Sequence, residues 1–238
     1  MRQDFKISYS RINLYLFCHY KYKLVYLDNI YVPISVDITF GRIIHKTLEQ
    51  FHRFEKSNRD LLFECYNNSW RNDGFVNPQQ IFEYYQRGKQ MLENYYRSFK
   101  ESDTEVLYVE KAFDTNIGKY KFIGIIDRVD RYPDGTYEII DYKTHIKAWE
   151  PERVNEDLQL SFYAYACRSV FGFNPDKMSV YFLSENKKVY TIKSQIEISD
   201  VINVAINTAE NIMAENFDPD VSKCQICDLK FKCKFFSF

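Results

Sequence analysis

Two short apolar stretches, each interrupted by one aspartate, constrain the fold of this chain more than any other feature. Residues 120–131 and 137–144 are rich in β-branched and aromatic residues and carry Asp127 and Asp141 among apolar neighbours. This composition favours strands, and the Pro-Asp-Gly sequence at 133–135 is typical of a turn. We therefore expect an antiparallel hairpin with a carboxylate in the middle of each strand.

The hairpin acids favour a cation site. Because strand side chains alternate between faces, Asp141 and Lys143 point the same way, and a carboxylate and an amine share one small site. An unpaired Asp127 would be costly in an apolar strand, and acids on adjacent strands repel each other unless Mg²⁺ or Mn²⁺ lies between them. The hairpin alone leaves an alternative open: ordinary salt bridges from Asp127 to Arg128 or Arg131, and from Asp141 to Lys143.

The rest of the chain changes period near residue 100. Apolar residues recur at helical spacing before this point, and alternation begins after it. We expect helices over about 8–26, from 39 or 41 through 51, 60–70, 79–100, 151–171 and 199–215, with further strands over 105–114, 178–183 and 188–193.

Composition excludes several classes of protein. The 238 residues are 45% hydrophobic and 27% charged, with only 7 glycines and 6 prolines, which is typical of a globular chain and not of a disordered one. No apolar run approaches the ~18 residues of a membrane span, and the first residues do not resemble a signal peptide, so we expect a cytoplasmic protein without a membrane partner. A net charge of -1 argues against general polyanion binding and leaves local basic patches, such as residues 1–27 and 221–238.

A cysteine-rich tail follows the last expected helix. Cys224, Cys227 and Cys233 offer three thiolates at short spacing, in a chain whose expected compartment disfavours disulfides. A fourth ligand must come from elsewhere if the thiolates hold a metal centre. Cys65 and Cys167 lie on helical patterns and are interpreted as small core residues.

The sequence resembles the RecB-type nucleases of the PD-(D/E)XK superfamily, in particular the iron-sulfur branch with CRISPR-associated exonucleases and AddB-type recombination nucleases. The resemblance implies an α/β (α+β) fold: a restriction-endonuclease-like core with a mixed central sheet flanked by helices. It implies one nuclease domain over 1–238, with a mainly helical part over 1–100, the core over 101–215 and a cluster tail over 216–238 clasped to the N-terminal helix. The matching stretches appear in family order: SYSRINLYLFCHYKYKLVYL, FGRIIHKTLEQF, GIIDRVDRYPDGTYEIIDYKT, QLSFYAYA and the cysteine tail.

The resemblance also implies roles for individual residues. His45 is expected to bind metal, as are the carboxylates of Asp127 and Asp141 and the backbone carbonyl of Tyr142. The catalytic residues are expected to be Lys143 with the same two aspartates.

Further residues have supporting roles. Gln159 and Tyr163 lie four apart on an expected helix, hence on one face, and the family implies that they position DNA or the site. We expect a supporting role for Glu110, whereas His52 and His145 are interpreted as structural or solvent-facing.

The family places its first cluster cysteine in the N-terminal helix, which implies Cys18 as the fourth ligand. A [4Fe-4S] cluster on Cys18, Cys224, Cys227 and Cys233 would order the tail. A Cys₄ zinc site and free thiols remain alternatives. Relatives commonly have proline after the first cysteine, where this chain has His19, and this histidine is an alternative ligand.

The function expected from these features is that of a metal-dependent deoxyribonuclease. We expect an Mg²⁺- or Mn²⁺-dependent exonuclease acting on single-stranded DNA or DNA ends, in CRISPR adaptation or in recombination and repair. The alternative is a noncatalytic DNA-binding or scaffold subunit that keeps the fold and assists a helicase or integrase. An RNA-directed enzyme is a third possibility.

Overall fold

The computed structural model describes residues 5–54, 58–144 and 147–236. The chain forms two compact units. The first, here called the sheet unit, comprises Ile34–Phe113 and Ile125–Ser194, and the second, the terminal unit, comprises Met1–Pro33, Asp114–Gly124 and Gln195–Phe238.

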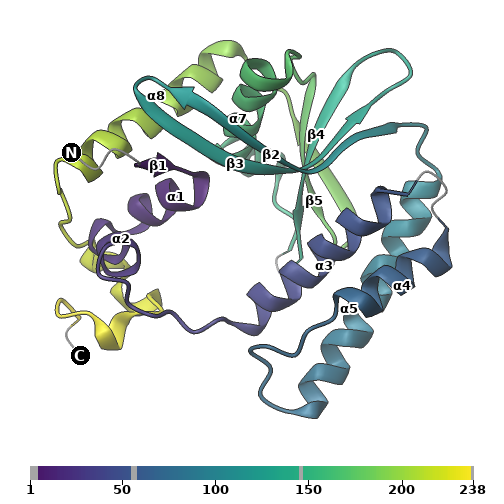
Figure 1. Ribbon diagram of the computed structural model, residues 1–238, viewed down its shortest axis with the longest axis horizontal. Helices are drawn as coiled ribbons and strands as arrows, with labels where there is room; N and C mark the ends of the chain where they lie inside the picture. Colours follow the sequence, from purple (N-terminus) through teal and green to yellow (C-terminus); the bar gives the residue numbers. More distant parts are fainter. Residues whose placement is uncertain (1–4, 55–57, 145–146, 237–238) are drawn as a thin grey trace. The chain divides into compact units, whose positions relative to one another are not determined.

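The sheet unit contains most of a mixed β-sheet and the helices on its faces (Figure 1). The strand order is β1-β3-β4-β5-β6, and β2 also pairs with β3. β3 and β4 are antiparallel, β4 and β5 are parallel, and β5 and β6 are antiparallel. The elements are α3 (Val36–His52), α4 (Arg59–Ser69), α5 (Pro78–Lys100), β2 (Glu105–Ile117), β3 (Tyr120–Arg131), β4 (Tyr137–Lys143), α6 (Pro151–Asn155), α7 (Leu158–Ala166), η1 (Cys167–Phe171), β5 (Lys177–Phe182) and β6 (Lys187–Thr191). The expected fold class, a mixed central sheet flanked by helices, and the antiparallel hairpin are confirmed.

β4 is the strand around which the sheet unit is organised. It pairs on both edges, and its five central residues are all buried. Ile140 and Tyr142 point into an apolar core formed with α3, α4 and α5, while α7 contacts β4 and β5. By alternation, Asp141 and Lys143 lie on the opposite face from this core.

Three expected helices differ from the structure at capping residues. α3 begins at Val36, earlier than expected, because the Ser35 hydroxyl accepts a hydrogen bond from the amide of Ile38 at 3.3 Å. The helix expected over 151–171 is divided, since Asp157 caps a new helix, α7, at its first turn. The N-terminal helix is divided at Cys18, whose extended backbone ends one helix and begins the next.

The terminal unit is built from β1 (Lys6–Ile7), α1 (Tyr9–Phe17), α2 (His19–Tyr26), α8 (Gln195–Met213) and the short turns η2 (Val221–Ile226) and η3 (Lys230–Lys232). Its small core includes Tyr15, Tyr22 and Ile212, and the Tyr15 hydroxyl donates to the backbone carbonyl of Asn216 at 2.6 Å. The ends of β2 and β3 also belong to this unit, where β1 pairs with β3. None of the helices in the described part of the chain is long and apolar enough to cross a membrane.

Candidate active site

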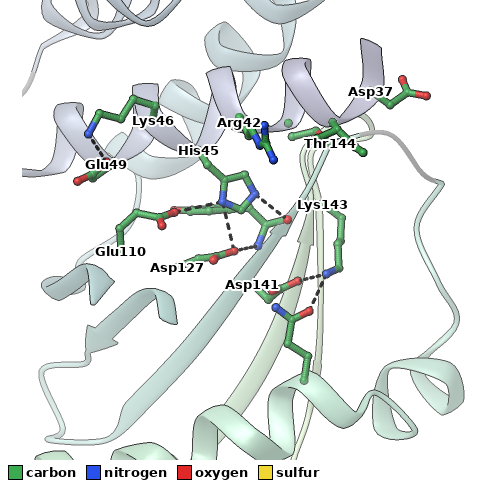
Figure 2. A pocket seen from close by; sticks show the side chains of 14 residues that line it. Asp37, Arg42, His45, Lys46, Glu49, Glu110, Asp127, Asp141, Lys143 and Thr144 are labelled. Atoms are coloured by element: carbon green, nitrogen blue, oxygen red, sulfur yellow. Dashed lines mark hydrogen bonds and ion pairs between the residues drawn. The ribbon is translucent and has the colours of Figure 1, made fainter. Parts of the chain in front are cut away.

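A cleft of about 480 Å³ lies in the sheet unit beside α3 (Figure 2). It is lined by residues from one helix, three strands and the start of another helix. α3 contributes His45, β2 contributes Glu110, and α7 contributes Gln159. The hairpin contributes Asp127, Asp141, Tyr142 and Lys143. All these residues were singled out from the sequence, and the fold brings them to one cavity.

The two hairpin aspartates meet because of strand register. Arg128 pairs with Ile140, and continuing this antiparallel register by one residue places Asp127 opposite Asp141. Both carboxylates are buried, with 6% and 2% of each residue exposed. Like charges directly opposite each other on a sheet are destabilising. The Asp127 Oδ2 atom accepts a hydrogen bond from the Tyr142 amide at 2.8 Å, which fixes one of the two carboxylates.

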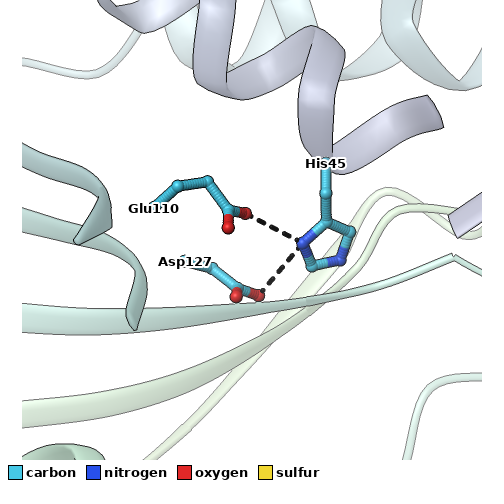
Figure 3. Close-up of side chains that lie close together, drawn as sticks. All are labelled: His45, Glu110 and Asp127. Atoms are coloured by element: carbon cyan, nitrogen blue, oxygen red, sulfur yellow. Dashed lines mark hydrogen bonds and ion pairs between the residues drawn. The ribbon is translucent and has the colours of Figure 1, made fainter. Parts of the chain in front are cut away.

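His45 links α3 to β2 and β3 through two carboxylates (Figure 3) and to β4 through a backbone carbonyl. Its Nδ1 atom lies 3.1 Å from Glu110 Oε1 and 3.6 Å from Asp127 Oδ2. Its Nε2 atom lies 3.1 Å from the backbone carbonyl oxygen of Tyr142. Since carboxylates and carbonyls only accept, both ring nitrogens donate in this arrangement.

Glu110 reaches the cleft from an unusual backbone conformation. Its φ is 44°, in the left-handed region that is uncommon for residues other than glycine. A residue held in this region costs of order 1–3 kcal/mol and persists where its surroundings fix it. Here the side chain is fixed by the hydrogen bond to His45.

Lys143 joins the acidic side of the cleft to α7. Its Nζ atom lies 2.7 Å from Asp141 Oδ2 and donates to Gln159 Oε1 at 2.9 Å. The Gln159 amide in turn donates to the Tyr163 hydroxyl at 2.6 Å. Tyr163 is only 5% exposed and lies behind Gln159, whereas Gln159 lines the cleft.

The sequence left open the alternative that Asp127 and Asp141 form ordinary salt bridges, and only one of these salt bridges is present. Asp141 does pair with Lys143, as that alternative proposed. Asp127 has no ion pair with Arg128 or Arg131, because Arg128 pairs with Asp130 and Arg131 with Glu105. Among the described residues, the Asp127 carboxylate therefore lies next to the His45 ring and accepts a hydrogen bond from the Tyr142 amide.

The pKa values of the site residues reflect buried, mutually repelling carboxylates. Burial raises the pKa of Asp141 to about 6, against the opposing effect of Lys143, and the charge of Asp127 adds to the increase. Burial also raises the pKa of Asp127. Burial opposes the charged form of His45, but Asp127 and Glu110 outweigh it and raise the pKa to about 9. The site therefore favours added positive charge.

The donor set fits a hard divalent cation. His45, Glu110 and Asp127 each offer one ligand atom, and these atoms all lie within 4.8 Å of one another. In addition, Asp141 Oδ2 is buried and receives no aligned hydrogen bond from the part of the chain that the structure describes. Carboxylate oxygens and an imidazole nitrogen are suitable ligands for Mg²⁺ or Mn²⁺.

A buried polar network lies behind the cleft. The Arg128 guanidinium forms a two-point ion pair with Asp130 and donates to the Tyr95 hydroxyl at 2.6 Å. The hydroxyls of Tyr95 and Tyr142 lie 2.9 Å apart, and the Tyr95 hydroxyl is also 2.5 Å from His52 Nε2. The network therefore holds the side chain of Tyr142. The backbone amide of this residue contacts Asp127, and its backbone carbonyl contacts His45. His52 thus has structural contacts, as expected, whereas His145 lies outside the described residues.

Two features of the site go beyond what was predicted from the sequence. Glu110 was given only a supporting role, yet it stands in the candidate ligand group with His45 and Asp127. The sequence shows only that Glu110 is an acidic residue on an expected strand, because its backbone conformation cannot be predicted from residue types. The Arg128 network was not predicted from the sequence either. Its ion pair, between Arg128 and Asp130, lies within the D-R-x-D sequence at 127–130 of β3.

The terminal unit contains a second candidate site. Cys18, Cys224, Cys227 and Cys233 line one pocket, and all four are partly buried free thiols. The tail is fastened to α2 by an ion pair of 2.7 Å between Lys21 and Asp228 and by ring contact between Tyr20 and Phe235. His19 instead stacks on Tyr15. Cys65 and Cys167 are buried elsewhere, in the sheet unit.

Among the described residues, no three of the four sulfurs form a group whose ligand atoms all lie within 4.8 Å of one another. Four thiols that line one pocket are a donor set that suits either a Cys₄ zinc site or a [4Fe-4S] cluster.

Comparison with known proteins gave four findings. The sequence profile of the PD-(D/E)XK nuclease superfamily matches residues 6–234. Among solved structures, the chain is similar to a protein from Eubacterium rectale described as "Putative exonuclease", with a TM-score of 0.58 and 11% identity over 98% of this chain and 90% of that chain. It also matches SSO0001, with a TM-score of 0.40 and 16% identity over 84% of this chain and 86% of that chain. The search of curated proteins gave no match. At 11% identity, the likeness to the Eubacterium rectale protein is one of fold.

Proposed function

The chain belongs to the PD-(D/E)XK nuclease superfamily, and from this premise we propose that it is an Mg²⁺- or Mn²⁺-dependent exonuclease acting on single-stranded DNA or DNA ends. The observation that carries the proposal is the convergence of His45, Glu110, Asp127, Asp141 and Lys143 on one cleft. The fold of the Eubacterium rectale protein is consistent with it.

The site residues have distinct roles in this proposal. His45, Glu110 and Asp127 would hold the cation, with Asp141 and the Tyr142 carbonyl as further oxygen donors. The bound cation would supply charge neutralisation and activation of water for phosphodiester hydrolysis.

Lys143 would act on the same phosphodiester as the cation, and its Nζ atom lies 2.7 Å from Asp141 Oδ2. Its ammonium group is a donor only, so it can orient the attacking water and stabilise negative charge that develops on the phosphate. Gln159 holds the ammonium group through the 2.9 Å hydrogen bond, and Tyr163 holds Gln159. We therefore assign Gln159 and Tyr163 to positioning, with Gln159 alone at the cleft surface.

We also propose that the four cysteines bind a [4Fe-4S] cluster that orders the tail. The shared pocket of Cys18 with the three tail cysteines supports this assignment. Together with the resemblance to the iron-sulfur branch, it favours a role in CRISPR adaptation or in recombination and repair.

Replacement of Lys143 tests the catalytic proposal. In anaerobic assays on end-labelled single- and double-stranded DNA with Mn²⁺, we expect Lys143→Ala to cut about 10²- to 10⁴-fold more slowly than the wild type, because a charged donor at the phosphate is lost. The released ends, resolved on a denaturing gel, separate stepwise digestion from internal cutting.

Lys187→Ala is the matched control, since Lys187 is an exposed lysine on β6 outside the cleft. We expect it to cut like the wild type. Equal rates for Lys143→Ala and the wild type would refute the mechanism. Wild-type protein that binds DNA ends but does not cut with Mg²⁺ or Mn²⁺ would refute the enzyme and favour a noncatalytic scaffold.

A further inference from the structure

A second cavity of about 290 Å³ adjoins the candidate active site within the sheet unit. Its lining includes Thr39, Arg42 and Lys46 from α3, Ser69 at the end of α4, and Arg71 just beyond it. We call it the basic cavity. Its volume is close to the lower end of the range for small-molecule sites, about 300 to 1,000 Å³.

The periodicity of α3 makes the two hollows neighbours. Ile38, Gly41, His45 and Glu49 line the active-site cleft, whereas Thr39, Ile43 and Gln50 line the basic cavity. These are adjacent stripes of one helix, because residues three and four apart share a face. Arg42 and Lys46 line both hollows and therefore form the ridge between them.

The two hollows have opposite charge. The cleft is lined by the carboxylates Glu110, Asp127 and Asp141, which suit a cation. The basic cavity is lined by three cations and a single carboxylate, Asp73. The two hollows are thus complementary to different parts of a ligand with two neighbouring phosphates. One phosphate would contact a cation held by the carboxylates of the cleft, and the other would contact the cations of the basic cavity.

The cations differ in how far they are already neutralised. Arg42 is exposed and has no ion pair or hydrogen bond within the described residues, and no dashed line joins it to a neighbour in Figure 2. Lys46 is paired with Glu49 at 2.7 Å, but Glu49 is shared with Arg53. Arg71 uses one terminal nitrogen for the carbonyls of Asn68 and Trp70, at 3.1 and 2.6 Å, so the rest of its guanidinium can bind another group.

We propose that the basic cavity binds a phosphate of the nucleic-acid strand adjacent to the phosphate being cut, with Arg42 and Arg71 as its ligands. Guanidinium groups form strong paired hydrogen bonds to phosphate oxygens, and such contacts fix the register of a strand without reading its sequence. Arg42 lies three residues, about 4.5 Å along the helix, from His45. The cavity would therefore position the next phosphate while the cleft holds the scissile one. The inference rests on the proposed nuclease function.

The salt dependence of binding tests this role. With the full-length protein, Ca²⁺ in place of Mg²⁺ and a fluorescent single strand confirmed to be uncut, we expect Arg42→Ala and Arg71→Ala each to lower the slope of log Kd against log salt by about 0.7, the value for one lost phosphate contact. For a variant that binds like the wild type at 1 M salt, this change in slope corresponds to roughly fivefold weaker binding than the wild type at 0.1 M salt. The double variant is expected to lower the slope by about 1.4.

Two further variants separate charge from folding. Arg42→Lys keeps the charge, and we expect it to retain most of the slope. Arg97→Ala removes an exposed arginine of α5 that lies outside both hollows, and we expect an unchanged slope. If Arg42→Ala and Arg71→Ala bind with the same slope as Arg97→Ala, the proposal is wrong.

The same assay distinguishes two sources of the phosphate. Strands with a 5′-phosphate and with a 5′-hydroxyl end are compared for each variant. An equal loss on both would identify an internal phosphodiester, and a loss confined to the 5′-phosphorylated strand would identify a terminal phosphate. Because binding is measured without cutting, an inactive wild type would contradict the proposed function but leave the slopes interpretable.

Discussion

The active-site cleft and the cysteine pocket hold their candidate ligands in different ways. In the cleft, Asp127 and Asp141 are almost completely buried on strands that pair on both sides. In the tail, the thiols are partly exposed on short turns, and Leu229 is the one apolar residue among the described tail residues with almost no exposure.

The difference indicates which site the fold builds and which site depends on its ligand. The cleft acids repel one another at a cost in folding energy, and a continuous core beneath β4 compensates for it. The tail buries too little apolar surface to offset the entropy of ordering its backbone. We therefore expect the cleft to exist without its cation, and the tail to need a centre bound to its cysteines.

Loss of a tail cysteine is expected to have the largest effect. Anaerobically purified wild type should be brown, and Cys224→Ser should be colourless, because a cluster needs four thiolate ligands. The free energy of metal binding is also folding free energy in such small sites. Limited proteolysis of the variant should therefore cut first within residues 216–236.

Two comparisons make this test specific. Cys65→Ala changes a buried cysteine of the sheet unit and should keep the colour. Treatment of wild type with EDTA should leave the proteolysis pattern of the sheet unit unchanged. A colourless wild type with one equivalent of zinc would overturn the cluster assignment, and protection of the Cys224→Ser tail would remove the contrast between the two sites.

The network behind the cleft should have the next largest effect, on the free energy of unfolding. Arg128→Ala leaves the buried Asp130 carboxylate and the Tyr95 hydroxyl without their partner. Breaking a buried ion pair in this way costs about 3–5 kcal/mol, measurable by urea unfolding. Arg97→Ala, which removes an exposed pair with Glu93, should change stability by less than about 1 kcal/mol. A similarly small change for Arg128→Ala would show that the cleft does not depend on this network.

The smallest effect concerns pH. Burial and the nearby Arg128 guanidinium lower the pKa of His52 well below its usual range. As the pH falls, His52 is therefore protonated in the unfolded chain before it is protonated in the folded protein. Stability is lost as the pH falls below the unfolded-state pKa of about 6.5. By pH 5.5 the loss from this one group should reach about 1 kcal/mol.

His52→Gln removes the titrating group and keeps an acceptor for the Tyr95 hydroxyl. Urea unfolding at pH 7.5 and 5.5 should show a smaller pH-dependent loss for this variant than for the wild type. Equal losses in both proteins would mean that other groups, and not His52, account for the acid sensitivity of the sheet unit.

The sequence allowed much of the fold to be predicted, because the relevant signals are local. Alternation of apolar residues placed β3 and β4, and the Pro-Asp-Gly turn predicted their pairing. The helix boundaries were less accurate, because Ser35 and Asp157 were not identified as the N-caps of α3 and α7. For the site, the position of Glu110 depends on a φ of 44°, and the hydrogen bond from Arg128 to the Tyr95 hydroxyl depends on long-range packing. Such features arise from tertiary structure and leave no periodic signal.

Tyr142 links the geometry of the candidate site to the correct alignment of one strand. Its amide contacts Asp127, its carbonyl contacts His45, and its hydroxyl lies 2.9 Å from that of Tyr95. A one-residue slip of β4 would turn every side chain to the other face of the sheet. A misaligned chain would then lose the acids, the amine and their support together. Errors in strand pairing would thus yield inert molecules instead of enzymes with relaxed selectivity, which would be a safeguard for a member of a nuclease superfamily.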